Sequence, residues 1–328
     1  MLVKDIYSVV EKDFEHVNQL IIEQLRSDVP MVEKIGHHII ESGGKRMRPL
    51  LVLLAAKSLL NNEQLAELGG KHALLASVIE FLHTATLLHD DVVDTSDLRR
   101  GKATANAKFG NAPSVLVGDF LYSRAFQMMV ELGFMGVMDI LSNATCVIAE
   151  GEVMQLMNVK NPDVGEDRYM SVIQGKTAML FEASSHAGAV LCQATPEQAE
   201  ALRLYGHHLG MAFQLVDDVL DYVGNAEDLG KNVGDDLAEG KPTLPLIFAM
   251  QNASEADSTL IRQAIRKGGT EDLEKIVGIV QACGAIDYTN QKAQEHVAAA
   301  KQAITILEDT QAKAALEALA DLAVSRKS

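Results

Sequence analysis

The sequence predicts an all-α fold, and three observations point to it. Long segments rich in Ala, Leu and Met recur along the chain, Trp is absent, and aromatic residues make up only 5%. No run of alternating β-branched residues stands out, and no Asn-Gly turn joins two such runs as it would in a hairpin. These features are typical of a helical bundle, so we expect a single domain over residues 1–328 with about ten or more helices.

Proline and glycine mark several joints between the expected helices. A Gly-Gly pair and a basic cluster lead to Pro49 and the apolar run LLVLLAA. The segment Thr195-Pro196 has the form of an N-cap followed by proline at the first helical position. Residues 288–324 are rich in Ala, Leu, Glu, Gln and Lys and have a helical rhythm. The Gly- and Asp-rich residues 224–245 predict a mobile lid, because long loops in compact domains are often functional.

Composition narrows the function classes. The chain has 29 Lys and Arg against 45 Asp and Glu, a net charge of −16, which disfavours nucleic-acid binding. An anionic substrate would need a local basic cluster or bound cations. The cysteines Cys146, Cys192 and Cys283 lie far apart and suit free thiols in a reducing cytosol. We expect a cytoplasmic protein without signal peptide or membrane span, since charges interrupt the N-terminal segment and every apolar run.

Two aspartate clusters with the same spacing carry most of the functional signal. The first is LLHDDVVD, with Asp90, Asp91 and Asp94, and the second is QLVDDVLD, with Asp217, Asp218 and Asp221. Both lie in apolar helical contexts, where residues i and i+4 share one face and like charges repel. Solvated acidic faces are the alternative interpretation, but two such clusters favour bound cations. Oxygen ligands without a nearby Cys or His set indicate Mg²⁺, which bridges readily to phosphate.

Basic residues near these clusters predict diphosphate binding. The turn GGKRMRP, with Lys45 and Arg48, enters a helix and offers backbone N–H groups beside its cationic side chains. Arg99 and Arg100 follow the first aspartate cluster, and arginine binds phosphate with bidentate geometry. His83 lies two helical turns before the cluster; by itself it would be read as a hydrogen-bonded core histidine.

Together these motifs resemble the trans-type isoprenyl diphosphate synthases, and among them the octaprenyl type of bacterial quinone biosynthesis. The resemblance covers nearly the whole chain. Six motifs follow in the family's order: GGKRMRP, LLHDDVVDTSDLRRG, VGDFLYSRAF, QGKTAMLFEAS, FQLVDDVLDY and GKNVGDDLAEGKPTLPL. The resemblance implies a bundle around a deep central cavity, a prenyltransferase activity and a homodimer.

The resemblance also implies roles for individual residues. Mg²⁺ ions that hold the allylic diphosphate would be bound by Asp90, Asp94 and Asp217. The diphosphate of isopentenyl diphosphate would be held by Lys45, Arg48, His83 and Arg100. The allylic site would be formed by Arg99, Lys176, Thr177, Gln214 and Lys231, with Lys231 closing over it.

Product length should depend on the depth of a tunnel below Asp90. The resemblance places the controlling positions one turn before it, at Ala85 and Thr86, where short-chain members often carry an aromatic ring. Both side chains are small here, so the tunnel is expected to be open at this level. Its floor is expected at Met128, Met129 or Phe126, although ordinary core packing explains the two methionines equally well.

Alternative functions stay open at this point. A short-chain synthase that makes farnesyl or geranylgeranyl diphosphate would share the same motifs, but Ala85 disfavours it. A terpene cyclase would lack the GGKRMRP turn. A non-catalytic subunit of a heteromeric synthase tends to lose aspartates or basic residues, whereas this chain keeps them.

Overall fold

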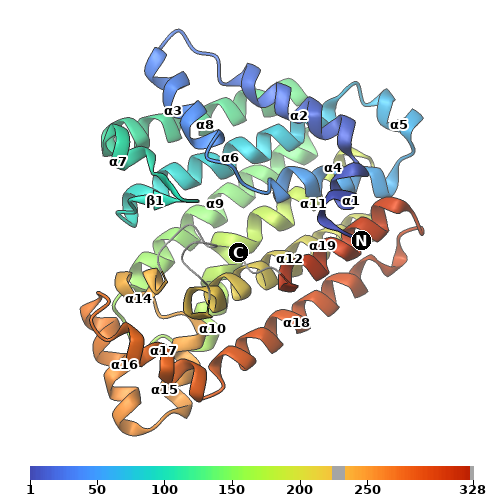
Figure 1. Ribbon diagram of the computed structural model, residues 1–328. Coiled ribbons are helices and arrows are strands. Elements are labelled where there is room, and N and C mark those ends of the chain that lie inside the picture. The colour runs from blue at the N-terminus through green and yellow to red at the C-terminus, as the bar shows by residue number, and fades with distance from the viewer. Residues whose placement is uncertain (224–232, 326–328) are drawn as a thin grey trace. The chain divides into compact units, whose positions relative to one another are not determined.

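The computed structural model describes residues 1–223 and 233–325, and nearly all regular structure in them is helical (Figure 1). The predicted all-α class is therefore confirmed. The chain separates into two compact units, described in turn below. Unit 1 comprises Met1–Asn143, Leu180–Gly206 and Ala303–Leu319, and unit 2 comprises Ala144–Met179, His207–Gln302 and Ala320–Ser328. The single domain and the central cavity stay predictions.

Unit 1 is formed by the N-terminal helices together with two later segments. Its N-terminal elements are α1 (Val3–Ser8), α2 (Glu11–Gln24), α3 (Pro30–Ile40), α4 (Met47–Leu59), α5 (Asn62–Glu67), α6 (Lys71–Val93), β1 (Leu98–Arg99), β2 (Lys102–Ala103), α7 (Ala105–Phe109) and α8 (Asn111–Leu132). It also holds the start of α9 (Met135–Asn158), α11 (Met179–Leu191), the start of α12 (Pro196–Val223), the 3₁₀ turn η2 (Ile304–Ile306) and most of α19 (Gln311–Ser325).

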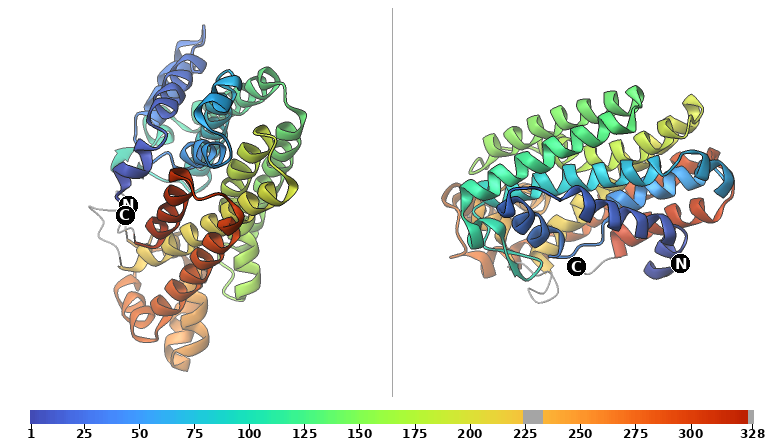
Figure 2. Two further views of the ribbon diagram at one scale, coloured as in Figure 1. Left: turned by 90° about the vertical axis from the view of Figure 1, so that its right-hand side faces the viewer. Right: turned by 90° about the horizontal axis from the view of Figure 1, so that it is seen from above.

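The helices α4 and α6 lie in the interior of unit 1. Both are apolar on nearly every side, and a helix of that kind is stable only when other helices surround it. Helices α4 and α8 both pack along α6, as the views in Figure 2 also show. Tight crossings need small residues: a Cβ atom on Gly118 of α8 would lie 2.4 Å from Nε2 of His89 on α6. The acidic end of α6 is thus held by a well-packed core.

A short β-hairpin follows α6 and differs from the expectation that the sequence carries no hairpin. Leu98 pairs with Ala103 and Arg99 with Lys102. The turn residues Arg100 and Gly101 have φ angles of +53° and +73°, as a two-residue type I′ turn requires. The strands are too short to show alternation, which is why the sequence pattern did not reveal them.

Unit 2 is formed by the middle of the chain. After the end of α9 it contains α10 (Glu166–Ile173), the π-helix η1 (Gln174–Ala178), the end of α12, α14 (Asp235–Glu239), α15 (Leu244–Asn252), α16 (Glu255–Lys267), α17 (Leu273–Ala282) and most of α18 (Ala285–Ala303). The expected lid begins with residues 224–232, which lie outside the described residues, and its remainder contains α14. Closure of a lid therefore stays a prediction.

The structure also tests two predicted helices. The start at Pro196 is confirmed, and the side chain of Thr195 accepts a hydrogen bond from the backbone N–H of Gln198 at 3.3 Å. Residues 288–324, whose composition and rhythm predicted helix, are largely helical and contain a break between α18 and α19. Lys313 stabilises the break, because its ammonium group donates to the carbonyl of Leu307 at 2.9 Å. A composition signal cannot detect such a local cap.

Candidate active site

The first aspartate cluster lies at the C-terminal end of α6. Asp90 is in the last turn, and Asp94 follows the helix, with its N–H donating to the Asp90 carbonyl at 2.7 Å. Both side chains are half-buried. The C-terminus of a helix carries partial negative charge, so each carboxylate there costs about 0.3–1 kcal/mol unless a cation compensates. This placement is unfavourable for stability alone and is typical of a cation site.

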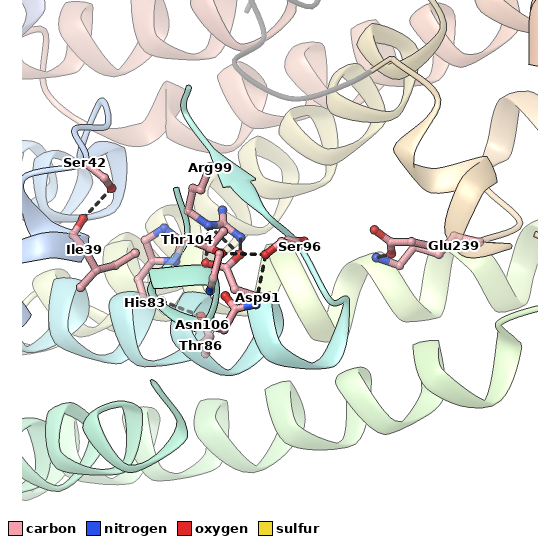
Figure 3. A network of polar contacts seen from close by, with 12 residues as sticks. Ile39, Ser42, His83, Thr86, Asp91, Ser96, Arg99, Thr104, Asn106 and Glu239 are labelled. Atoms are coloured by element: carbon pink, nitrogen blue, oxygen red, sulfur yellow. Dashed lines mark hydrogen bonds and ion pairs between the residues drawn. The ribbon is translucent and has the colours of Figure 1, made fainter. Parts of the chain in front are cut away.

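The middle residue of the cluster, Asp91, has a different environment. Its side chain is only 1% exposed and forms an ion pair with Arg99, whose Nη2 and Nε donate to Oδ1 at 2.6 and 3.0 Å (Figure 3). Sequence reasoning overlooked this role of Asp91, because spacing alone does not show which of two adjacent aspartates turns inward. The ion pair fixes Arg99 over the end of α6.

The hairpin that carries Arg99 is attached to the same helix end. The carbonyl of Ser96 accepts hydrogen bonds from the Thr104 hydroxyl at 2.7 Å and from the Asn106 amide at 3.1 Å (Figure 3). Thr104 also caps α7. On the other side, Lys102 donates to the Glu41 carbonyl at 2.8 Å. Arg99 of β1 and Arg100 of the turn therefore belong to a hairpin that is closed at its base and held through Lys102 of β2.

The basic turn before α4 forms the second part of the site in unit 1. Gly43 and Gly44 have φ angles of +90° and +130°, which side chains rarely allow. The guanidinium of Arg100 covers Gly44, since a Cβ atom there would lie 2.4 Å from Nη1 of Arg100. Lys45 is exposed, and its carbonyl accepts a hydrogen bond from the hydroxyl of Tyr7. The structure thus brings the predicted GGKR turn and Arg100 together.

Arg48 and His83 also meet in unit 1. Nη1 of Arg48 lies 3.2 Å from Nε2 of His83, and its guanidinium stacks on Phe181 with 4.2 Å to the ring centre. Burial lowers the pKa of Arg48 to about 10, so the side chain stays charged at neutral pH. Burial, and then the charges of Arg48 and its neighbours, hold the pKa of His83 well below its usual value. His83 is therefore neutral and can share hydrogen bonds with Arg48 and a phosphate.

In unit 2 the second aspartate cluster lies in the last two turns of α12. Asp217 is half-buried, whereas Asp218 and Asp221 are 3% and 0% exposed. Asp218 accepts hydrogen bonds from Tyr169 and from Gln214, the latter at 2.7 Å. Burial and then the charge of Asp236 raise the pKa of Asp218 to about 8. Of this cluster, Asp217 is the aspartate best exposed to a ligand.

The predicted residues Lys176 and Thr177 belong to the π-helix η1. Such bulges are found frequently at functional sites. Gly151 of α9 permits close contact here, because a Cβ atom on it would lie 2.6 Å from the backbone nitrogen of Lys176. Lys176 donates to Glu152 at 2.6 Å, and Thr177 donates to Gln214 at 2.8 Å. Thr177, Gln214 and the second aspartate cluster are therefore connected. Lys231 lies outside the described residues.

The predicted chain-length residues are placed on α6 and α8 of unit 1. Ala85 is fully buried, and the Thr86 hydroxyl donates to the carbonyl of His83 at 2.7 Å. Met129 is buried on α8, eleven residues after Gly118, or about 16 Å along the helix. Gly118 contacts His89, which directly precedes Asp90 in the chain. The stretch of α8 from Gly118 to Met129 therefore begins at the level of the aspartates and extends into the core. The role of these residues in product length stays a prediction.

The helical fold, with acidic ends on two long helices and a basic turn, defines the class of isoprenoid synthases. The family model "Polyprenyl synthetase" matches residues 29–282, and the chain belongs to this family. It is therefore a prenyltransferase, as the sequence motifs imply. No helix in the described part of the chain is long and apolar enough to cross a membrane.

Individual relatives agree with this assignment. The chain is 51% identical to an octaprenyl diphosphate synthase of Escherichia coli, over 99% of each chain. It is 49% identical to a geranyl-diphosphate-specific all-trans-nonaprenyl-diphosphate synthase of Rhodobacter capsulatus, over 98% of each chain. Among solved structures, a polyprenyl synthase of Caulobacter crescentus, crystallised with calcium and isoprenyl diphosphate, has a TM-score of 0.95 and 44% identity, covering 100% of this chain and 98% of that one.

Proposed function

We propose that this chain condenses isopentenyl diphosphate head-to-tail onto an allylic diphosphate and makes a long all-trans polyprenyl diphosphate, of the octaprenyl type, for the side chain of a respiratory quinone such as ubiquinone. The observation that carries the proposal is the 51% identity to an octaprenyl diphosphate synthase over 99% of each chain. The small, buried Ala85 supports a long product.

We propose Mg²⁺ as the cofactor, with Asp90 and Asp94 holding ions in unit 1 and Asp217 holding another in unit 2. The donor chemistry fits, because half-buried carboxylates at helix ends are hard oxygen ligands that suit this ion. The calcium of the Caulobacter structure supports a divalent ion. When bound, the metal would neutralise negative charge on the allylic diphosphate.

The basic residues receive the two substrates. We assign Lys45, Arg48, His83 and Arg100 to isopentenyl diphosphate, and Arg99, Lys176, Thr177, Gln214 and Lys231 to the allylic substrate. The ion pair with Asp91 holds Arg99 at a defined position, and preorganised cations of this kind stabilise charge as it develops.

The reaction then follows from charge. The allylic C–O bond breaks, and the diphosphate leaves with the electron pair. The double bond of isopentenyl diphosphate forms the new C–C bond to the allylic carbon, and a proton is lost, which we assign to the released diphosphate. Buried apolar side chains of α4 and α6 exclude water, which would otherwise capture the cation.

We also propose a homodimer that acts in the cytoplasm. Helix α8 exposes large apolar side chains, with Leu116 66% and Val130 69% exposed, and we propose this helix as part of the dimer surface. The three cysteines are free thiols, as expected in a reducing compartment. The hydrophobic product would pass to membrane enzymes.

The direct test is an incubation with farnesyl diphosphate, labelled isopentenyl diphosphate and Mg²⁺, followed by chromatography of the dephosphorylated products. A dominant product near the octaprenyl length, lost with EDTA, is expected. Products that stop at geranylgeranyl length would support the short-chain alternative, and incorporation with dimethylallyl but not with farnesyl diphosphate would indicate a farnesyl diphosphate synthase. No incorporation would support a non-catalytic subunit.

Tunnel depth has its own test. Replacing Ala85 with Phe should place a ring across the tunnel one turn below Asp90 and stop growth near geranylgeranyl length. An unchanged product would contradict the assignment of Ala85. Met129→Ala, which widens the core at the expected floor, should instead lengthen the product.

A further inference from the structure

Glu80 is a buried carboxylate on α6 that the proposed reaction does not use. Its side chain lies one turn before His83 and is only 12% exposed. One oxygen, Oε1, is 3.9 Å from Nε of Arg46, and the other, Oε2, is buried and accepts no hydrogen bond from any residue that the structure describes. A carboxylate removed from water is costly unless cations surround it.

Three arginines supply that positive charge. Burial raises the pKa of Glu80, while Arg46, Arg48 and Arg100 lower it. These arginines come from the start of α4 and from the hairpin turn, so one carboxylate on α6 faces two separate segments of the basic pocket. Without it, the repulsion among the three positive charges would lack this compensation.

Arg46 connects this carboxylate to the backbone of the turn. Its φ angle is +44°, in the left-handed region, where a residue with a side chain costs roughly 1 kcal/mol or more. The guanidinium is held by Asn18 of α2 in addition to Glu80 of α6. The strained backbone is therefore stabilised through the side chain. Arg46 lies directly after Lys45 and two residues before Arg48, so its conformation sets where both side chains begin.

We propose that Glu80 is a positioning residue for isopentenyl diphosphate: it holds the turn through Arg46 and offsets the repulsion between Arg48 and Arg100, so that the cations meet the diphosphate at fixed positions. The inference rests on the proposed function, which assigns Arg48 and Arg100 to that substrate. The inference predicts the opposite of what the net charge of the pocket alone would predict. Neutralising Glu80 makes the pocket more positive, yet binding of the diphosphate should weaken.

The test uses the full-length chain with Glu80→Gln, which keeps the shape and removes the charge. Calorimetry with isopentenyl diphosphate should show about tenfold weaker binding, or about 1.4 kcal/mol. The KM for this substrate should rise by a similar factor, while the KM for farnesyl diphosphate stays within about twofold. Glu80→Asp should recover part of the loss. Glu67→Gln, which removes an exposed carboxylate from α5, is the matched control and should change neither value.

A double-mutant cycle shows whether Glu80 acts through Arg46. Arg46→Gln alone should raise the KM for isopentenyl diphosphate about as much as Glu80→Gln does, and the double variant should be little worse than either. This single variant also serves if Glu80→Gln fails to fold in a thermal melt. Three outcomes would overturn the inference alone. Glu80→Gln could bind isopentenyl diphosphate as tightly as the wild type or more tightly, or the effects of the two single variants could add in the double variant. The KM values for isopentenyl diphosphate and farnesyl diphosphate could also rise equally. A wild-type chain that neither binds nor condenses isopentenyl diphosphate would overturn the proposed function and this inference with it.

Discussion

The two Asp-Asp-x-x-Asp segments have the same spacing, but their middle residues are stabilised in opposite ways. Asp91 at the end of α6 is buried against the guanidinium of Arg99, at 2.6 Å. Asp218 on α12 is buried against a phenol and an amide, near Asp236, and its pKa rises to about 8. Asp91 holds a cation in place, whereas the surroundings of Asp218 favour its protonated form.

The outer residues of the two segments differ as well. Asp94 follows the end of α6 and is half-buried, whereas Asp221 is fully buried and accepts a hydrogen bond from the backbone N–H of Asp236 at 3.2 Å. The first segment therefore offers two accessible carboxylates and the second offers mainly Asp217. The two segments thus differ in how many carboxylates they present to a ligand, and the second also joins α12 to α14 through Asp221.

The largest expected effect on kcat distinguishes Asp90, a proposed metal ligand, from Asp218, a buried aspartate with a structural role. Asp90→Asn should lower kcat by about 10²- to 10³-fold, because it removes a proposed ligand of the metal that neutralises charge on the leaving diphosphate. Asp218→Asn should lower it only about tenfold, the lower end of the effect of residues that support metal ligands. Steady-state rates at saturating Mg²⁺ compare the two. Equal losses would mean that the segments are functionally equivalent.

The middle aspartates should differ in stability. Asp91→Asn leaves the guanidinium of Arg99 without its carboxylate and should cost about 2–3 kcal/mol in the free energy of unfolding. Asp218→Asn replaces a mostly neutral group and should cost about 1 kcal/mol or less. Urea unfolding without metal measures both. A larger loss in Asp218→Asn would show that Asp218 is charged in the folded protein.

His83, which lies among the basic residues near the first segment, should make the stability of the fold depend on pH. Because the folded-state pKa of His83 is depressed, the unfolded chain takes up a proton that the folded chain does not as pH falls below about 6.5. The wild type should thus lose stability below that pH, and His83→Gln should lose less. Thermal melts across this range, with the exposed His16→Gln as control, test the sign. Parallel curves for wild type and His83→Gln would refute it.

The smallest effects concern the threonines that support each segment. Thr104→Val removes the hydroxyl that binds Ser96 and caps α7, and should cost about 1 kcal/mol. Thr177→Val removes a hydrogen bond to Gln214 and should cost about 0.5–1 kcal/mol while raising the KM for the allylic substrate. If Thr104→Val instead leaves stability unchanged, the hairpin does not depend on this anchor.

The sequence by itself determined the helical class, the family and the acidic and basic motifs, because these depend on local composition and on spacing that survives in the linear chain. The sequence did not reveal the π-helix or the hairpin, since each involves only a few residues. The π-helix depends on close contact with Gly151, and the hairpin on a hydrogen bond to Ser96.

Only the tertiary structure decided which carboxylates turn inward. Asp90 and Asp91 are neighbours with the same chemistry, and so are Asp217 and Asp218. Their roles diverge because Arg99 folds back over one helix, while Tyr169 and Gln214 meet the other. The charge state of a buried group depends on such long-range neighbours and on the loss of water, and neither is written in residue spacing.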